Sequence, residues 1–136
     1  MIYKATIHAN APSKSNTYKI IRRKTPNGYK AGLAKSEKVR MFEIFARSCY
    51  SKELKNANIC KPFRLDLFVY FKTSASDLDN SAKAILDSLQ NEGVIKNDNL
   101  CFELNMKKGV DRYNPRIELK LSILRSNCFR KGFKAV

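Results

Sequence analysis

The sequence is poor in several residue types that mark particular classes of protein. It has no tryptophan, one histidine (His8) and only 12 acidic residues among its 136. With a single histidine the chain offers no histidine cluster for a transition metal. The four cysteines are scattered and form no CxxC pair, which argues against a zinc site and favours free thiols in a reducing cytoplasm. They are Cys49, Cys60, Cys101 and Cys128.

Long hydrophobic segments are absent as well. No apolar run approaches the roughly 20 residues that a membrane-spanning helix needs. The N-terminal stretch 1–14 lacks the continuous apolar core of a secretory signal. We therefore expect a cytoplasmic protein with no membrane partner and no small-molecule cofactor. A length of 136 residues and a hydrophobic fraction of 43% suit one folded domain.

The shortage of acids leaves the chain strongly basic. Its 27 lysines and arginines give a formal net charge of +15. Repulsion on that scale opposes a compact fold, so it predicts a polyanionic partner, of which the phosphate backbone of nucleic acid is the commonest. A merely solubilising basic surface is the alternative. An anionic membrane is disfavoured because no strongly amphipathic basic helix stands out.

The first half of the chain contains a strand, a long polar stretch and a helix. Residues 2–8 alternate as a strand does. Residues 9–33 are polar and include the basic run 18–24, which fits either a loop that contacts DNA or a hairpin capped by an Asn27-Gly28 turn. Apolar residues then recur at intervals of three and four, predicting a helix over 36–55 with Ser36 as its cap.

The second half predicts one more helix and three more strands. A strand begins after Pro62, and a helix runs from about Leu78 to Glu92 and ends at Gly93. Strands over 100–107 and 116–124 follow, joined by a hairpin loop at 109–115. The order β-α-β-α-β-β favours an α+β fold (a small mixed α/β domain), in which a mixed sheet is covered by two helices. We expect one domain over 1–124 and a basic C-terminal tail over 125–136.

Acidic residues gather where the second strand gives way to the second helix. Asp77 and Asp79 lie two residues apart, so in an extended segment they project to the same side. Lys83 is one helical turn beyond Asp79, and Asp87 is one turn further. Asp98 follows the helix, and it can approach the same site if the third strand runs beside the second. These residues predict a metal site that faces a basic surface.

The chemistry of the cluster indicates which metal it would bind. Carboxylate oxygens without histidine or cysteine suit Mg²⁺ or Mn²⁺. Ordinary structural roles explain the same residues. Ser76 and Asp79 match a helix-capping box, residues 97–99 are common turn chemistry, and Lys83 could form solvated pairs with its neighbours.

A known family shares these motifs. Residues 77–89 resemble the signature DLDN-x-x-K-x-x-x-D-x-L of the RusA family of Holliday junction resolvases. The segment 93–98, GVIKND, is similar to that family's helix end and its aspartate-bearing turn, and residues 12–18, PSKSNTY, are similar to its Pro-Ser-x-Asn loop, offset by one residue. The chain departs from the family at Ser76, where a basic residue is frequent, and at Asn97, where an acidic pair begins. Asp98 is therefore the only acid in that turn.

The resemblance implies a function and roles for the matching residues. It implies a Mg²⁺-dependent endodeoxyribonuclease, with Mn²⁺ as a substitute, that resolves four-way DNA junctions by paired symmetric nicks as a homodimer. Asp77, Asp79 and Asp98 match the metal-binding aspartates, and Lys83 matches the functional lysine. It is also compatible with a phage or prophage gene. The number of metal ions, one or two, remains open. Two other functions also remain open: a nuclease for other branched or flapped DNA, and a non-catalytic nucleic-acid-binding module.

We expect DNA contacts from the basic run and from the family-like loop before it. These residues are Lys14, Asn16, Lys19, Arg22, Arg23 and Lys24.

Overall fold

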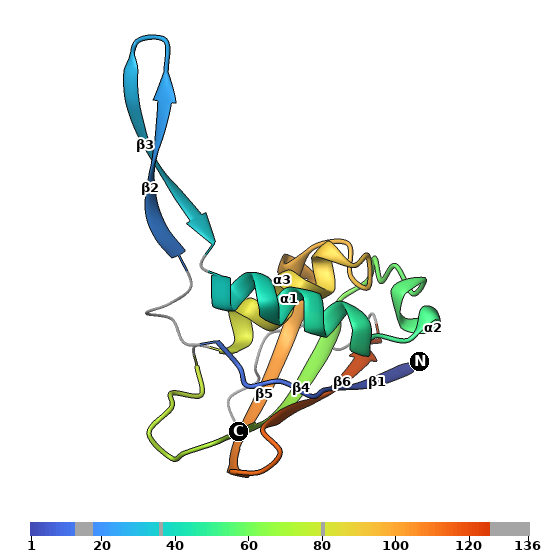
Figure 1. The fold of residues 1–136 in the computed structure, drawn as a ribbon. Coiled ribbons are helices and arrows are strands. Elements are labelled where there is room, and N and C mark those ends of the chain that lie inside the picture. The colour runs from blue at the N-terminus through green and yellow to red at the C-terminus, as the bar shows by residue number, and fades with distance from the viewer. Residues whose placement is uncertain (13–17, 36, 80, 126–136) are drawn as a thin grey trace, which may run out of the picture.

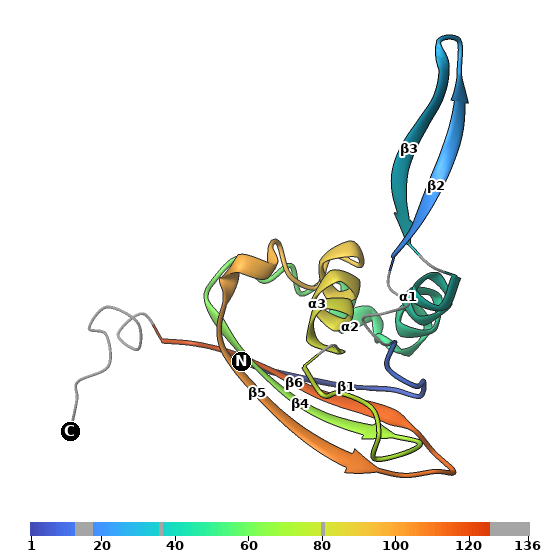
Figure 2. The same ribbon diagram turned by 90° about the vertical axis from the view of Figure 1, so that its left-hand side faces the viewer.

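The computed structural model describes residues 1–12, 18–35, 37–79 and 81–125. A four-stranded mixed sheet forms one layer, and helices α1 (Glu37–Cys49) and α3 (Ser81–Asn91) pack over one of its faces (Figures 1 and 2). The predicted α+β fold, with a mixed sheet covered by two helices, is confirmed. Within the described ranges no helix is long and apolar enough to cross a membrane.

The sheet is built around its central strand pair. Its order is β1-β6-β4-β5, with β1 at Ile2–Ile7, β6 at Arg116–Ile123, β4 at Phe63–Phe71 and β5 at Cys101–Val110. Every second residue of β4, from Phe63 to Phe71, is buried, while the residues between them are half-buried on the uncovered face. This alternation follows from the two-residue period of a strand, and it fixes which face of β4 the helices cover.

The last two strands correct one prediction. A hairpin between them was expected because a short turn-rich segment joins them, but β5 and β6 do not pair. Strand β4 lies between them and pairs parallel to β5 and antiparallel to β6. The connection therefore passes the end of β4. Strand β5 does run beside β4, but the two are parallel, so Cys101 near Asp98 pairs with Phe63 at the start of β4, whereas the chain toward Asp77 leaves from Phe71 at its end.

The helices are shorter than the sequence predicted. The helix expected over 36–55 ends at Cys49, and Ser51 then caps a separate short helix α2 (Lys52–Lys55) by accepting a hydrogen bond from the Leu54 amide at 3.1 Å. The predicted cap Ser36 lies outside the described residues. Helix α3 begins at Ser81 instead of Leu78, so the capping-box interpretation of Ser76 and Asp79 is wrong.

Contacts between α1 and α3 fix the helical layer. The hydroxyls of Tyr50 and Ser88 lie 2.6 Å apart in the buried space between the helices. Burial raises the pKa of Tyr50 above its ordinary value, and the hydrogen bond to Ser88 only partly offsets this effect. At the surface, Arg47 Nε donates to Glu92 Oε1 at 2.7 Å. Helix α3 also carries Lys83, one of the predicted site residues.

The long polar stretch contains a hairpin arm. Strands β2 (Tyr18–Thr25) and β3 (Gly28–Lys35) pair antiparallel through a two-residue turn at residues 26–27, and the arm projects away from the sheet and helices (Figures 1 and 2). Gly28 has φ of 121°, a conformation that other residues rarely adopt, so the turn requires glycine there. The hairpin alternative for this segment is thus the correct one, although the turn lies at residues 26–27 and not at the predicted Asn27-Gly28 pair.

Candidate active site

The first part of the site is the connection between β4 and α3. Strand β4 ends at Phe71, and Asp77 and Asp79 lie in the chain that leads from there to α3 at Ser81. Both aspartates are exposed. Ser81 is buried and its hydroxyl donates to the Leu78 carbonyl at 2.7 Å, which holds the chain where it enters the helix. The two carboxylates therefore occupy an accessible segment at the start of α3.

Lys83 in the first turns of α3 brings two acids together. Its Nζ lies 3.1 Å from Asp87 Oδ1 and 3.2 Å from Asp98 Oδ2. The first contact is the expected helical i,i+4 pair, whereas the second joins residues 15 positions apart. Hydrogen bonds to Asp87, and then to Asp98, raise the pKa of Lys83 above its ordinary value. The ammonium therefore stays charged throughout the neutral range.

Asp98 is held in place by a well-defined turn. It begins the short 3-10 helix η2 (Asp98–Leu100), which Asn97 caps by accepting from the Asn99 amide at 3.0 Å. The backbone amide of Asp98 donates to Gln90 Oε1 at 3.1 Å, which ties the turn to α3. The turn chemistry expected at residues 97–99 is present, and it directs the Asp98 carboxylate toward Lys83.

The predicted site residues are only partly assembled. Lys83 and Asp98 meet directly, but in the part of the chain that the structure describes, no three His, Cys, Asp or Glu side chains lie close enough together to hold a metal ion. The chemistry of Asp77, Asp79 and Asp98 fits Mg²⁺ or Mn²⁺, because all three supply carboxylate oxygens. These three ligands remain a prediction.

The predicted DNA contacts divide between the arm and a segment outside the described residues. Lys14 and Asn16 fall in that segment, and Lys19 lies in β2. Arg22, Arg23 and Lys24 are exposed along the same strand. Arg22 and Lys24 pair with Ala31 and Tyr29 across the arm, while Arg23 pairs with Lys30, so cations occupy both faces of the arm. The first acidic residue in the chain is Glu37, so the arm contains no carboxylate.

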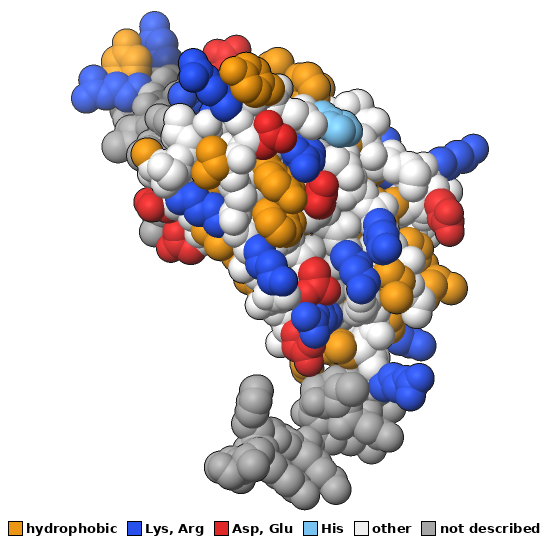
Figure 3. Space-filling model, turned by 90° about the horizontal axis from the view of Figure 1, so that it is seen from below, with side chains coloured by type: hydrophobic (Ala, Val, Ile, Leu, Met, Phe, Trp, Pro, Cys, Tyr) orange, Lys and Arg blue, Asp and Glu red, His pale blue; other side chains and the backbone are white. Residues whose placement is uncertain are grey.

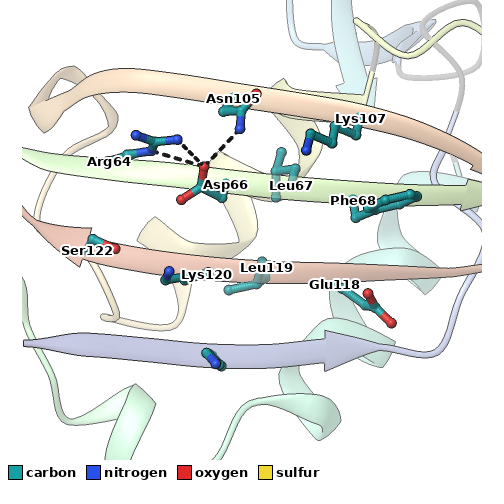
Figure 4. A pocket seen from close by; sticks show the side chains of 11 residues that line it. Arg64, Asp66, Leu67, Phe68, Asn105, Lys107, Glu118, Leu119, Lys120 and Ser122 are labelled. Atoms are coloured by element: carbon teal, nitrogen blue, oxygen red, sulfur yellow. Dashed lines mark hydrogen bonds and ion pairs between the residues drawn. The ribbon is translucent and has the colours of Figure 1, made fainter.

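The uncovered face of the sheet has a different character. Seen from below, it mixes basic, acidic and hydrophobic side chains (Figure 3). A hollow on this face contains Asp66, whose Oδ1 accepts from Arg64 Nε at 3.0 Å and from Asn105 Nδ2 at 3.1 Å (Figure 4). Burial alone would raise the pKa of Asp66, but the hydrogen bonds from Arg64 and Asn105 outweigh it and the pKa is lowered.

Sequence reasoning assigned no role to this network. Asp66 and Asn105 are 39 residues apart, and only the pairing of β4 with β5 makes them neighbours. In this face each carboxylate has a cation beside it, as Arg116 also donates to Glu118 at 3.2 Å and to Asp111 at 2.9 Å. The paired charges leave less unbalanced positive charge here than on the arm, so the arm is the better candidate for phosphate contacts.

A comparison with known protein families covers the segments that hold the predicted site residues. The family model of endodeoxyribonuclease RusA matches residues 12–122. The protein belongs to the RusA family. The match extends from just before the arm to the end of the sheet and includes Asp77, Asp79, Lys83 and Asp98.

A shorter stretch is similar to an individual RusA protein. The crossover junction endodeoxyribonuclease RusA of Aquifex aeolicus (strain VF5) is 38% identical to this RusA-family chain over 45 residues. That stretch covers 33% of this chain and 36% of the relative, so the chain matches about a third of the length of this relative. The similarity thus adds local support to a family membership that rests on the longer match.

Proposed function

We propose that this protein is a Mg²⁺-dependent crossover junction endodeoxyribonuclease. The observation that carries the proposal is the Lys83–Asp98 contact, which joins the helix that follows Asp77 and Asp79 to the turn that bears the third aspartate, in a chain of an endodeoxyribonuclease family. Four-way DNA junctions are the proposed substrate. We propose that the protein acts in the cytoplasm and that Mn²⁺ can replace Mg²⁺.

Each proposed site residue has a chemical task. Asp77, Asp79 and Asp98 would hold the divalent ion, which when bound polarises the scissile phosphate and lowers the pKa of the attacking water. Two carboxylate neighbours raise the pKa of Lys83 above the ordinary lysine value, which already lies well above neutral pH, so the side chain is charged there. Its ammonium would stabilise the negative charge that develops on a phosphate oxygen. The accessibility of Asp77 and Asp79 supports the proposal, since the phosphate must reach the metal.

The arm would supply most of the affinity for DNA. Two eight-residue strands extend for roughly 27 Å at about 3.4 Å per residue. A two-stranded ribbon of this kind can enter a major groove about 12 Å wide. Lys19, Arg22, Arg23 and Lys24 would contact phosphates there, together with Lys14 and Asn16 from the preceding segment. Such contacts position the protein without reading sequence.

A homodimer would explain paired nicks. A four-way junction has twofold symmetry, and a twofold dimer brings two copies of one site to its two equivalent strands. Each protomer would then contribute one active site and one arm. Symmetric cleavage follows if both sites act within the lifetime of a single complex.

Substrate comparison in the presence and absence of metal tests the function. Wild-type protein and the Asp98→Asn variant are incubated with four-way junction, flap and linear duplex DNA, in Mg²⁺ and in excess EDTA. We expect wild type to cut the junction preferentially and only with Mg²⁺, while Asp98→Asn binds the junction but does not cut it. Preferential cleavage of the flap would indicate a nuclease for other branched DNA. Junction binding without cleavage under any condition would indicate a non-catalytic module.

A further inference from the structure

A lysine on the sheet edge contacts the connection that carries the two exposed aspartates. Lys108 lies in β5, and its Nζ donates to the carbonyl of Ser74 at 2.7 Å and to that of Ser76 at 2.5 Å. The same ammonium lies 5.8 Å from the centroid of the Phe71 ring, at the end of β4. One side chain thus links β5 to the chain immediately before Asp77.

The strand register explains why Lys108, and not its neighbour, makes these contacts. Lys108 is opposite Val69 in the parallel β4–β5 pair, and Val69 is buried beneath the helical layer. Because strand residues alternate between faces, Lys108 points to the side of the sheet where the connection returns toward α3. Lys107 points to the other side, where it lines the hollow on the uncovered face (Figure 4).

The two accepting carbonyls belong to residues two apart in a segment outside any helix or strand. Both carbonyls lie within residues 72–79 and accept from the Lys108 ammonium, a side chain of β5. Hydrogen bonds from a charged donor are stronger than those between neutral groups. Together they restrict the backbone direction from which Asp77 and then Asp79 follow. A metal site made of flexible ligands must order them on binding, and prior restriction lowers that entropic cost.

We propose that Lys108 is a positioning residue that preorganises Asp77 and Asp79 for the divalent ion. This inference rests on the proposed function, because it concerns the same metal site. Lys108 touches neither metal nor DNA in this role and acts through the backbone of residues 74–76. Its loss should therefore weaken metal binding and leave the chemical step intact once metal saturates the site.

The matched pair Lys108→Met and Lys107→Met tests this role. Both variants lose one positive charge from adjacent positions of β5, but only the first loses the contacts to the connection. Single-turnover cleavage of the junction is measured across a Mg²⁺ titration, and Mn²⁺ binding to the DNA-free protein is measured by electron paramagnetic resonance. For Lys108→Met we expect the half-saturating concentration of both ions to rise roughly tenfold or more, as is typical when a group that orients metal ligands is removed.

The expected pattern separates positioning from other roles of a lysine. Cleavage by Lys108→Met at saturating Mg²⁺ should return to within about twofold of wild type, and Lys107→Met should match wild type in both titrations. Lys108→Arg, which retains several donors, should restore most of the metal affinity. If Lys108 instead contacted a DNA phosphate, Lys108→Met would reduce the dependence of DNA binding on salt and leave Mn²⁺ binding to the free protein unchanged. That result would overturn the proposal.

Failure of the inference differs from failure of the proposed function. If wild type cuts in Mg²⁺ but Lys108→Met and Lys107→Met share the wild-type metal requirement, only the role of Lys108 is refuted. If wild type neither cuts nor binds Mn²⁺, the metal site itself is refuted, and this inference falls with it. Should Lys108→Met not fold, Lys108→Thr replaces it, since a β-branched residue suits a strand and its short side chain cannot reach the Ser74 and Ser76 carbonyls, and an unchanged metal requirement there also refutes the role.

Discussion

Replacing Lys83 with methionine removes an ammonium that joins two carboxylates while keeping most of the aliphatic stem. In the folded protein this ammonium lies 3.1 Å from Asp87 and 3.2 Å from Asp98. The lysine side chain is 63% exposed. Ion pairs of such exposed groups typically contribute under about 1 kcal/mol each, because water and salt screen them. We therefore expect Lys83→Met to fold and to unfold at nearly the wild-type denaturant concentration.

A catalytic role predicts a much larger effect on the rate. If Lys83 stabilises developing charge as an oxyanion donor does, its loss should raise the barrier by roughly 2 to 4 kcal/mol. This range corresponds to a rate lower by about thirtyfold to nearly a thousandfold. The assay is single-turnover cleavage of preformed protein–junction complexes in saturating Mg²⁺, so that weaker DNA or metal binding does not account for the loss.

Asp87→Asn is the matched control for this prediction. It weakens the helical pair but leaves Lys83 and the Lys83–Asp98 contact in place. A catalytic Lys83 predicts slow cleavage by Lys83→Met and near wild-type cleavage by Asp87→Asn. If Lys83→Met cuts at close to the wild-type rate, Lys83 is only a solvated residue of α3 and the reasoning fails.

Three further predictions concern the arm, the sheet and pH. Changing Arg22, Arg23 and Lys24 together to glutamine should lower the slope of log affinity against log salt by about 0.9 for each lost phosphate contact, measured by fluorescence anisotropy; an unchanged slope would remove the arm from the DNA interface. In Gly109→Ala the new Cβ would lie 2.7 Å from the Tyr70 ring and 2.8 Å from the Phe68 ring, so urea unfolding should show a loss of about 1–3 kcal/mol, and an unchanged midpoint would mean that the rings move aside freely. Because the pKa of Asp66 is lowered on folding, its charge stabilises the fold above the unfolded-state pKa near 4, and this stabilisation is lost as the pH falls through the folded-state value. The small loss of unfolding free energy that we expect for Asp66→Asn at pH 7 should therefore shrink below about pH 4, and a loss independent of pH would contradict this.

Local periodicity was enough to predict several elements. The alternation of β4 and the helical stripe of α3 follow directly from side-chain spacing, and both are present, as is the positive-φ Gly93 after α3. The residue types of the acidic cluster also indicated an oxygen-ligand site without any structure. The inferences about β4, α3 and Gly93 succeed because each depends on residues within one or two turns of each other, whereas the oxygen-ligand site stays a prediction.

Breaks within elements were harder to predict than the elements themselves. The apolar stripe of residues 36–55 continues past Cys49, yet the helix stops there. The buried hydroxyl contact between Tyr50 and Ser88 and the capping of α2 by Ser51 accompany this break. Ser88 belongs to α3, so the Tyr50–Ser88 contact depends on a residue 38 positions away. The periodicity of a single helix cannot predict such a contact.

The sequence by itself determined which chemical groups this protein has: a basic chain, acidic residues grouped beside a helix, and an Asn27-Gly28 pair that allowed either a hairpin or a loop. Only the tertiary structure decided which of these groups meet. The insertion of β4 between β5 and β6, the approach of Asp98 to Lys83, and the contact of Lys108 with the connection before Asp77 all join distant segments. The physical reason is that local spacing fixes which way a side chain points along its own element, whereas strand order and helix packing fix what it points at.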